Sequence, residues 1–255
     1  MSAAVLIRDA AWAVVWDAPG KRHAYARGMD VLVEGGRIAA IARHDPDAPP
    51  PAGAEVVDGR RLLVMPGLVN IHTHPTTEPA SRGVREDHGV PEQQMTGLFE
   101  RLQAFRIDQA GQAAAMRLAI ILARNAVRDV AAADTGSVFH AATVGGATAL
   151  GRPDLGRIEK GAVADLVMVD LAHPLMTPPR DPLRALLFHA ADRAVKRVLV
   201  GGETVFANGR PTRLDVTEAA GILAESQARM LRDARGRDYR GRSGDEIAPL
   251  ALPLH

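Results

Sequence analysis

Two histidines separated by one residue are the most informative chemical feature of this sequence. His72 and His74 close the stretch Met65-Pro-Gly-Leu-Val-Asn-Ile-His-Thr-His. If residues 67–74 form a strand, alternate side chains share a face, so both imidazoles point the same way about 7 Å apart at the backbone. Two such imidazoles can converge on one divalent ion at about 2.1 Å. A bare His-x-His pair often occurs by chance, but this one ends an apolar run after a Pro-Gly turn and follows a β-rich segment. In this context the pair predicts a divalent-metal site, with zinc as the first candidate and iron or nickel as alternatives.

A complete metal site needs further ligands, and the loop after the pair offers some. His88, in the sequence REDHGV, is the nearest candidate third ligand, and Glu78 and Asp87 could supply oxygen atoms. A loop histidine more often faces solvent, so two interpretations of His88 stay open: a third metal ligand, or a solvent-exposed loop residue. His140, in an Ala-rich helical stretch, is expected to pack, and Asp134, just before that stretch, is expected to cap or turn the chain. No catalytic acid or base is assigned.

Composition excludes several classes of protein. The 255 residues contain no cysteine, which rules out disulfides, cysteine-bound zinc and a thiol nucleophile. With 31 basic and 30 acidic residues the net charge is +1, so neither nucleic acid nor a membrane surface is an expected partner. No apolar run approaches the roughly 20 residues of a membrane span, and the N-terminus lacks a signal peptide's pattern. We therefore expect a cytoplasmic protein.

β-rich segments at both ends of the sequence enclose a helical middle. Short apolar runs predict strands at 3–7, 11–16, 29–34, 37–42, 55–57, 61–65, 67–74, 164–170, 195–200 and 204–207. Gly35-Gly36, Asp58-Gly59 and Gly201-Gly202 are typical of hairpin turns between such runs. The Pro-rich stretch 45–53 is expected to be a surface loop.

Helical spacing of apolar residues occupies the middle. It runs from residue 95 to 130, with Gly111 as a candidate break between two helices. A further helix is predicted over 137–150 with Ser137 as its N-cap. Its paired glycines, Gly145 and Gly146, either weaken that helix or let another backbone approach closely. A last helix over 216–234 precedes an Arg-rich tail.

Four stretches together resemble the metal-dependent amidohydrolases of the cytosine deaminase and triazine or chlorohydrolase branch. They are the N-terminal β segment with VEGGRIAAI, then PGLVNIHTHP, then FHAATVGGATALG with LGRIEKGAVADLVMVDL, and finally DPLRALLFHAADRAVKRVLVGGETVFANGR. The resemblance implies an α/β fold, a (β/α) barrel joined to a discontinuous small β-sandwich built from both ends. Residues 1–65 and 161–212 would form the sandwich, 66–160 the barrel part, and 213–255 the C-terminal helix and tail.

The resemblance also implies a chemistry. A metal at the barrel mouth would activate water to attack a C–N bond (amide, amidine or ring amino group) of a small heterocyclic substrate. Only the His72 and His74 pair of the family's ligands carries over, because about 90 residues lie between His74 and Ala164 and an eight-unit barrel takes about 250. We therefore expect a partial barrel.

Three readings follow from a partial barrel. The chain is a hydrolase completed by a second copy in a homo-oligomer or by a second polypeptide, or it is a catalytically incomplete remnant without enzymatic activity. In the third reading it is a metal-binding module without turnover.

Overall fold

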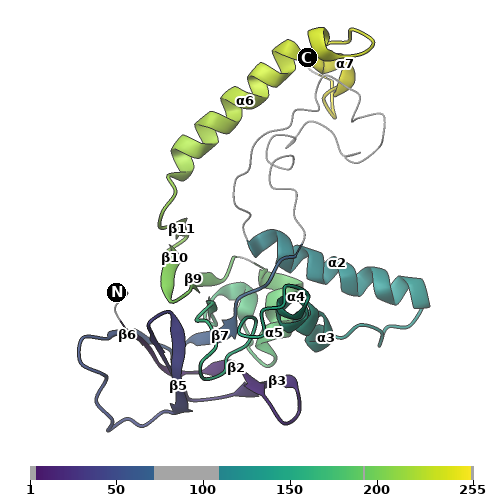
Figure 1. The fold of residues 1–255 in the computed structure, drawn as a ribbon. Coiled ribbons are helices and arrows are strands. Elements are labelled where there is room, and N and C mark those ends of the chain that lie inside the picture. Colours follow the sequence, from purple (N-terminus) through teal and green to yellow (C-terminus); the bar gives the residue numbers. More distant parts are fainter. Residues whose placement is uncertain (1–3, 72–108, 192, 254–255) are drawn as a thin grey trace. The chain divides into compact units, whose positions relative to one another are not determined.

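The computed structural model of the protein describes residues 4–71, 109–191 and 193–253. These residues belong to two compact units, the first comprising residues 4–71 and 109–213 and the second residues 214–253 (Figure 1). Within these ranges no helix combines the length and the apolar character that crossing a bilayer requires. The expected domain boundaries at residues 65 and 160 stay predictions.

A seven-stranded sheet forms the centre of the first unit and draws strands from both β-rich ends of the sequence. Its order is β11-β10-β9-β8-β7-β2-β3. The strands are β2 (Trp12–Asp17), β3 (Arg22–Ala26), β7 (Leu62–Pro66), β8 (Leu166–Asp170), β9 (Val195–Val200), β10 (Glu203–Ala207) and β11 (Arg210–Pro211). β7 runs parallel to β2 and antiparallel to β8. The β7–β8 pair therefore joins the two ends of the sequence.

A four-stranded sheet of order β5-β4-β1-β6 uses N-terminal residues alone. Its strands are β1 (Val5–Ala10), β4 (Met29–Glu34), β5 (Arg37–Arg43) and β6 (Glu55–Asp58). The predicted hairpins at Gly35-Gly36 and Gly201-Gly202 are confirmed, since β4–β5 and β9–β10 are antiparallel pairs. All four turn glycines have positive φ, which suits residues without a Cβ.

The predicted hairpin at Asp58-Gly59 is wrong. β6 pairs with β1 in the four-stranded sheet, whereas β7 lies in the seven-stranded sheet, so the chain crosses between sheets here. Gly59 serves this crossing through close approach, because a Cβ on it would lie 2.7 Å from the backbone nitrogen of Ala10. Glycine is needed at position 59, but for a close backbone contact and not for a hairpin turn.

The strands β7 and β8 are buried on both faces, which creates three layers. Leu62 and Val64 pack with side chains of the four-stranded sheet in one apolar cluster. The alternate residues Leu63 and Met65 pack with helical residues in a second cluster on the opposite face. A continuous apolar run is the expected pattern for strands covered on both sides. The central sheet thus lies between a smaller sheet and a layer of helices.

The helical layer is built from short elements around one long helix. They are α2 (Gln109–Val127), α3 (Thr135–His140), the π-helical turn η1 (Ala141–Gly145), α4 (Gly146–Ala149), the 3₁₀ turn η2 (Pro174–Met176), α5 (Pro182–Ala185) and the π-helical turn η3 (Leu186–Ala190). Gly111 lies in the first turn of α2, and the helix predicted before it lies outside the described residues, so the break between two helices stays a prediction. In one apolar cluster, Phe139 of α3 and Leu183 of α5 pack with Leu63 and Met65 of β7.

The start of α3 also corrects the sequence analysis. Asp134 is the N-cap, because its carboxylate accepts a hydrogen bond from the Ser137 backbone N–H at 3.0 Å. The Ser137 hydroxyl donates to the other carboxylate oxygen of Asp134 at 2.6 Å. The capping role expected of Asp134 is thus observed, and the N-cap predicted at Ser137 is wrong. The hydrogen bonds from Ser137 hold the pKa of Asp134 below its usual value.

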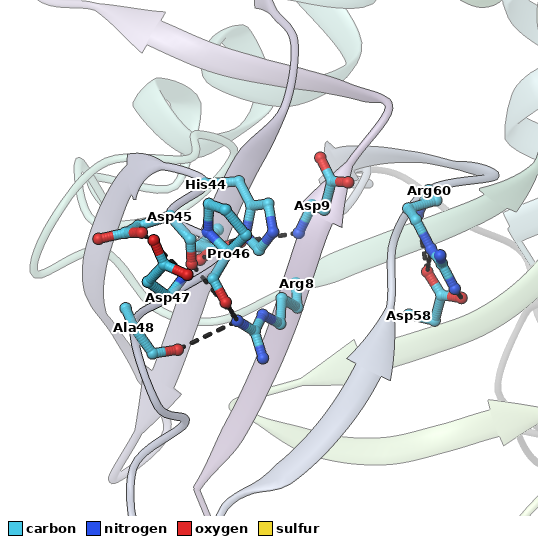
Figure 2. A network of polar contacts seen from close by, with 10 residues as sticks. Arg8, Asp9, His44, Asp45, Pro46, Asp47, Ala48, Asp58 and Arg60 are labelled. Carbon is cyan, nitrogen blue, oxygen red and sulfur yellow. Dashed lines mark hydrogen bonds and ion pairs between the residues drawn. The ribbon is translucent and has the colours of Figure 1, made fainter.

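The Pro-rich loop is tied to β1 by a single arginine. The Arg8 guanidinium donates to the carbonyl oxygens of Pro46 at 2.9 Å and Ala48 at 3.0 Å, as Figure 2 shows. Beside it the Asp30 carboxylate accepts from the Asp9 backbone N–H at 2.7 Å and lies 2.9 Å from His44 Nδ1. The Arg8 contacts satisfy carbonyl oxygens of the loop from outside it, in addition to bonds within the loop such as that from the Ala48 N–H to the Asp45 carbonyl oxygen at 3.3 Å.

The second unit contains the helices α6 (Val216–Arg237) and α7 (Gly244–Ile247). Asp238 follows α6 and is buried, and it accepts two hydrogen bonds at 3.1 Å from the Arg242 guanidinium. This pairing holds the pKa of Asp238 well below its usual range. At least this arginine of the Arg-rich tail is therefore committed to an internal ion pair.

These layers are a mixed α/β arrangement, as predicted, and the described residues contain no closed barrel. The finer description, a barrel remnant joined to a β-sandwich, stays a prediction.

The central sheet makes a direct stability test possible. Leu166 in β8 is fully buried, so Leu166→Ala should lower the free energy of unfolding by about 2–5 kcal/mol. Val200 in β9 is 48% exposed, so Val200→Ala should change it by less than about 0.5 kcal/mol. Urea unfolding followed by circular dichroism measures both. Equal effects would contradict the three-layer packing.

Candidate functional site

The chain leaves β7 toward the candidate metal ligands without forming a strand. Residues 67–71 are irregular, so the predicted strand over 67–74 is wrong in its first part. His72, His74 and His88 lie outside the described residues, and so do the candidate oxygen ligands Glu78 and Asp87. What the structure does describe is how the segment 67–71, which leads directly into His72, is held.

The first anchor of this segment is Gly67. Its backbone N–H donates to the carbonyl oxygen of Asp165 at 2.8 Å. A Cβ on Gly67 would lie 3.2 Å from the Asp165 Cβ, so the glycine permits a tight approach. The Asp165 carboxylate in turn accepts from the Gly201 backbone N–H at 2.7 Å, and burial raises its pKa. The start of the segment is therefore fixed to the residues that precede β8.

The second anchor depends on the π-helical turn. The Val69 backbone N–H donates to the carbonyl oxygen of Ala142 at 2.8 Å. In a regular α-helix that carbonyl would accept the N–H of Gly146, four residues on. Here the Gly146 N–H donates to Ala141 and Thr143 instead. The Ala142 carbonyl therefore does not accept the Gly146 N–H, and it accepts the Val69 N–H from outside the helix.

Gly146 lets the two backbones meet. A Cβ on Gly146 would lie 2.4 Å from the Val69 carbonyl oxygen and 3.0 Å from the Val69 Cβ. No side chain fits in that space without displacing Val69. A Cβ on the neighbouring Gly145 would have its nearest contact at 3.5 Å, which is ordinary van der Waals distance. Of the two outcomes predicted for this glycine pair, close backbone approach is the one that Gly146 shows.

His23 contacts the same π-helical turn through Thr143. The Thr143 hydroxyl donates to the Phe139 carbonyl oxygen at 2.7 Å, so it is free to accept from His23 Nε2, 2.9 Å away. His23 is then the neutral tautomer with its proton on Nε2. Burial, followed by the nearby His140 and Arg157, lowers the pKa of His23 to about 4. An uncharged imidazole therefore supports the turn at neutral pH.

Aromatic rings enclose His23. Its ring makes edge-on contacts with Trp16 and Phe139 at centroid distances of 5.4 and 5.1 Å. His140 stacks on Trp16 at 6.0 Å, in agreement with its predicted packing role. Within the described part of the chain, His23 Nδ1 and Arg157 Nε are buried and have no hydrogen-bond partner.

Sequence reasoning missed His23, because its partner Thr143 lies 120 residues away and no local motif marks it. A polar residue on a strand next to Trp16 and Thr143 is recognisable only once the fold brings them together.

The described residues contribute no metal cluster of their own. Among them no group of three or more histidine, aspartate or glutamate side chains could hold an ion. By donor chemistry, the two imidazoles of His72 and His74 fit two of the four positions of a tetrahedral zinc site. The remaining positions need donors from elsewhere.

Comparison with known proteins decides the kinship. A model described as the amidohydrolase family matches residues 87–205. The chain contains an amidohydrolase-family domain. The resemblance to amidohydrolases seen in the sequence motifs is therefore confirmed.

Curated proteins similar to this chain include deaminases. The chain is 37% identical over 116 residues to a 5-methylthioadenosine/S-adenosylhomocysteine deaminase of Haloquadratum walsbyi, which covers 46% of this chain and 26% of the relative. It is 31% identical over 103 residues to a 5'-deoxyadenosine deaminase of Methanopyrus kandleri, which covers 40% of this chain and 24% of the relative. The matched stretch thus spans about a quarter of the length of these relatives.

Solved structures share the fold. An adenosine deaminase from Xanthomonas campestris with bound zinc superimposes with a TM-score of 0.68 at 15% identity, over 89% of this chain and 98% of the other. The atrazine chlorohydrolase from Arthrobacter aurescens complexed with zinc gives 0.66 at 14% identity, over 88% and 100%. At such low identity these matches speak for the fold alone.

The hydrogen bond between His23 and Thr143 can be tested by removing its acceptor. Thr143→Val leaves the N–H of the half-buried His23 without its acceptor and should lower the free energy of unfolding by about 1–3 kcal/mol. The double variant His23→Phe with Thr143→Val removes both polar partners and should lose less than the sum of the two single variants. Urea unfolding measures this cycle, and strict additivity would argue against the bond.

The lowered pKa of His23 predicts a pH dependence of stability. The unfolded chain binds a proton at His23 near pH 6.5, but the folded chain does so only near pH 4. Stability from this group is therefore complete above about pH 6.5 and is lost as the pH falls toward 4. Across this window His23→Phe should show a flatter profile of thermal stability than the unmodified protein. Identical slopes would rule out a buried neutral His23.

Proposed function

We propose that the protein is a metal-dependent hydrolase that cleaves a C–N bond of a small heterocyclic compound. The observation that carries this proposal is the amidohydrolase domain over residues 87–205, together with relatives named as deaminases of adenosine derivatives. An amide, an amidine or a ring amino group is the bond class. A ring amino group on a purine-like substrate is the first choice, by analogy with those relatives.

The metal ligands in this proposal are His72 and His74, with His88 as a third candidate. Zinc is the first choice of ion, supported by the zinc-bound structural neighbours, and iron or nickel are alternatives. Such an ion, when bound, supplies an activated water near neutral pH. The described residues contribute by anchoring the segment before these ligands, since Gly67 and Val69 are hydrogen-bonded within five residues of His72.

Two imidazoles do not complete a catalytic zinc site, which normally has three protein ligands. The proposal therefore includes completion of the barrel by a second copy of the chain or by a second polypeptide. The active form would be an association of chains with a small-molecule substrate, without nucleic acid or membrane partners and in the cytoplasm. Its activity per chain would fall on dilution.

The second candidate function rests on the ligand count, because only the His72 and His74 pair carries over from the family's ligands. In this alternative the chain is a catalytically incomplete form of the family, which folds and binds a metal loosely, or acts through protein contacts without turnover.

Metal content tests the ligand assignment. After dialysis the protein should retain close to one zinc ion per chain, and His72→Ala and His74→Ala should each lose most of it. His173→Asn is the control, because Asn can still accept the Leu175 N–H that His173 now caps at 3.2 Å. Mass spectrometry of metals provides the measurement. Metal-free protein, or equal loss in all three variants, would refute the assignment.

Turnover separates the two candidate functions. Ammonia release from adenosine, 5'-methylthioadenosine and amino-substituted triazines should be detectable and should depend on both His72 and chain concentration. The rate per chain should rise as sedimentation shows association. A protein that binds metal, associates and releases no ammonia from any of these compounds would support the incomplete form instead.

A further inference from the structure

We infer that the π-helical turn η1 and Gly146 act as a positioning device for the metal-ligand segment. They hold Val69, and Val69 determines where the chain enters His72. The inference rests on the proposed function for the role of His72 and His74, but its structural part concerns described residues only. None of its groups touches a substrate, so Gly146 is a positioning residue and not a catalytic one.

The reach of the chain makes this anchor effective. Each residue spans at most about 3.6 Å, so the His72 Cα lies within about 11 Å of the Val69 Cα. A second hydrogen bond fixes Gly67 two residues earlier at 2.8 Å from Asp165. Two backbone positions, three and five residues before His72, are therefore fixed by hydrogen bonds.

The turn itself is held from three sides, which makes it a rigid support. Thr143 is buried and binds both the Phe139 carbonyl and the His23 ring. Gly156 runs against the turn, because a Cβ on it would lie 2.6 Å from the Thr143 carbonyl oxygen. Val144 packs into the interior. A π-helical turn costs energy relative to a regular helix, and here its effect is to offer one carbonyl outward to Val69.

The adjacent glycines provide a matched pair of variants. Gly146→Ala places a Cβ 2.4 Å from the Val69 carbonyl oxygen, so Val69 must move. Gly145→Ala adds the same methyl group one residue earlier, where the nearest contact is 3.5 Å. Both residues have helical φ values near −60°, so neither change strains the backbone. Any difference between the variants therefore reports the contact with Val69.

Two measurements are made on each full-length variant well below its unfolding temperature. Hydrogen exchange of the Val69 amide should accelerate at least about tenfold in Gly146→Ala and stay within twofold of wild type in Gly145→Ala. Affinity for Co²⁺, followed through its visible absorption, should fall about 10- to 100-fold in Gly146→Ala only, as for loss of a group that orients metal ligands. The absorption spectrum reports coordination geometry, which a purely structural role would leave unchanged.

A further variant guards against a folding defect. Gly67→Ala crowds the other anchor more mildly, at 3.2 Å from the Asp165 Cβ, and should give a smaller loss of Co²⁺ affinity. Unchanged Val69 exchange in folded Gly146→Ala would overturn the inference, as would equal Co²⁺ affinity in both glycine variants. If wild type binds no Co²⁺, the proposed metal site fails, and so does the positioning role toward it. Val69 exchange then shows only whether the backbone anchor exists.

Discussion

The hydrogen bond from Val69 to the Ala142 carbonyl connects two parts of this protein that the sequence keeps apart. Ala142 lies in a π turn, in which the Gly146 N–H does not donate to the Ala142 carbonyl. Gly146 allows the close approach of the Val69 backbone, and the hydrogen bond between His23 and Thr143 stabilises the turn. The segment leading to His72 and His74 thus takes its position from the fold, although it has no regular structure of its own.

The same reasoning explains why the helical layer and the sheets are inseparable here. β7 and β8 bury alternate side chains in opposite directions, so both the four-stranded sheet and the helices are needed to cover them. Removing either layer would expose a face of Leu, Val and Met side chains to water. The anchor of the metal-ligand segment lies in the helical layer, and its stability therefore derives from the packing of the whole unit.

Much of the fold could be predicted from the sequence, because strands and glycine turns leave local signals. The runs at residues 29–34 and 195–200 matched strands to the residue, and two Gly-Gly turns were hairpins as expected. Gly59 misled, because glycine also marks close backbone contact, which depends on a distant partner. The family resemblance could be predicted from sequence motifs. The role of His23 could not be predicted, because it depends on Thr143, which lies 120 residues away in the sequence. For His72 and His74 the sequence remains the basis of the assignment.

The pairing of Pro66 with Leu166 has a consequence for how chains of this type change length. The described residues between them lie outside the sheet, so the chain leaves the sheet and returns to it at neighbouring points. The entropy of closing a loop grows only with the logarithm of its length, and a threefold change costs about 1 kcal/mol. Pieces of this excursion that do not cover the sheet can therefore be lost or gained while the strands on either side remain paired. The architecture separates survival of the fold from survival of the reaction centre, and evolution can change one without the other.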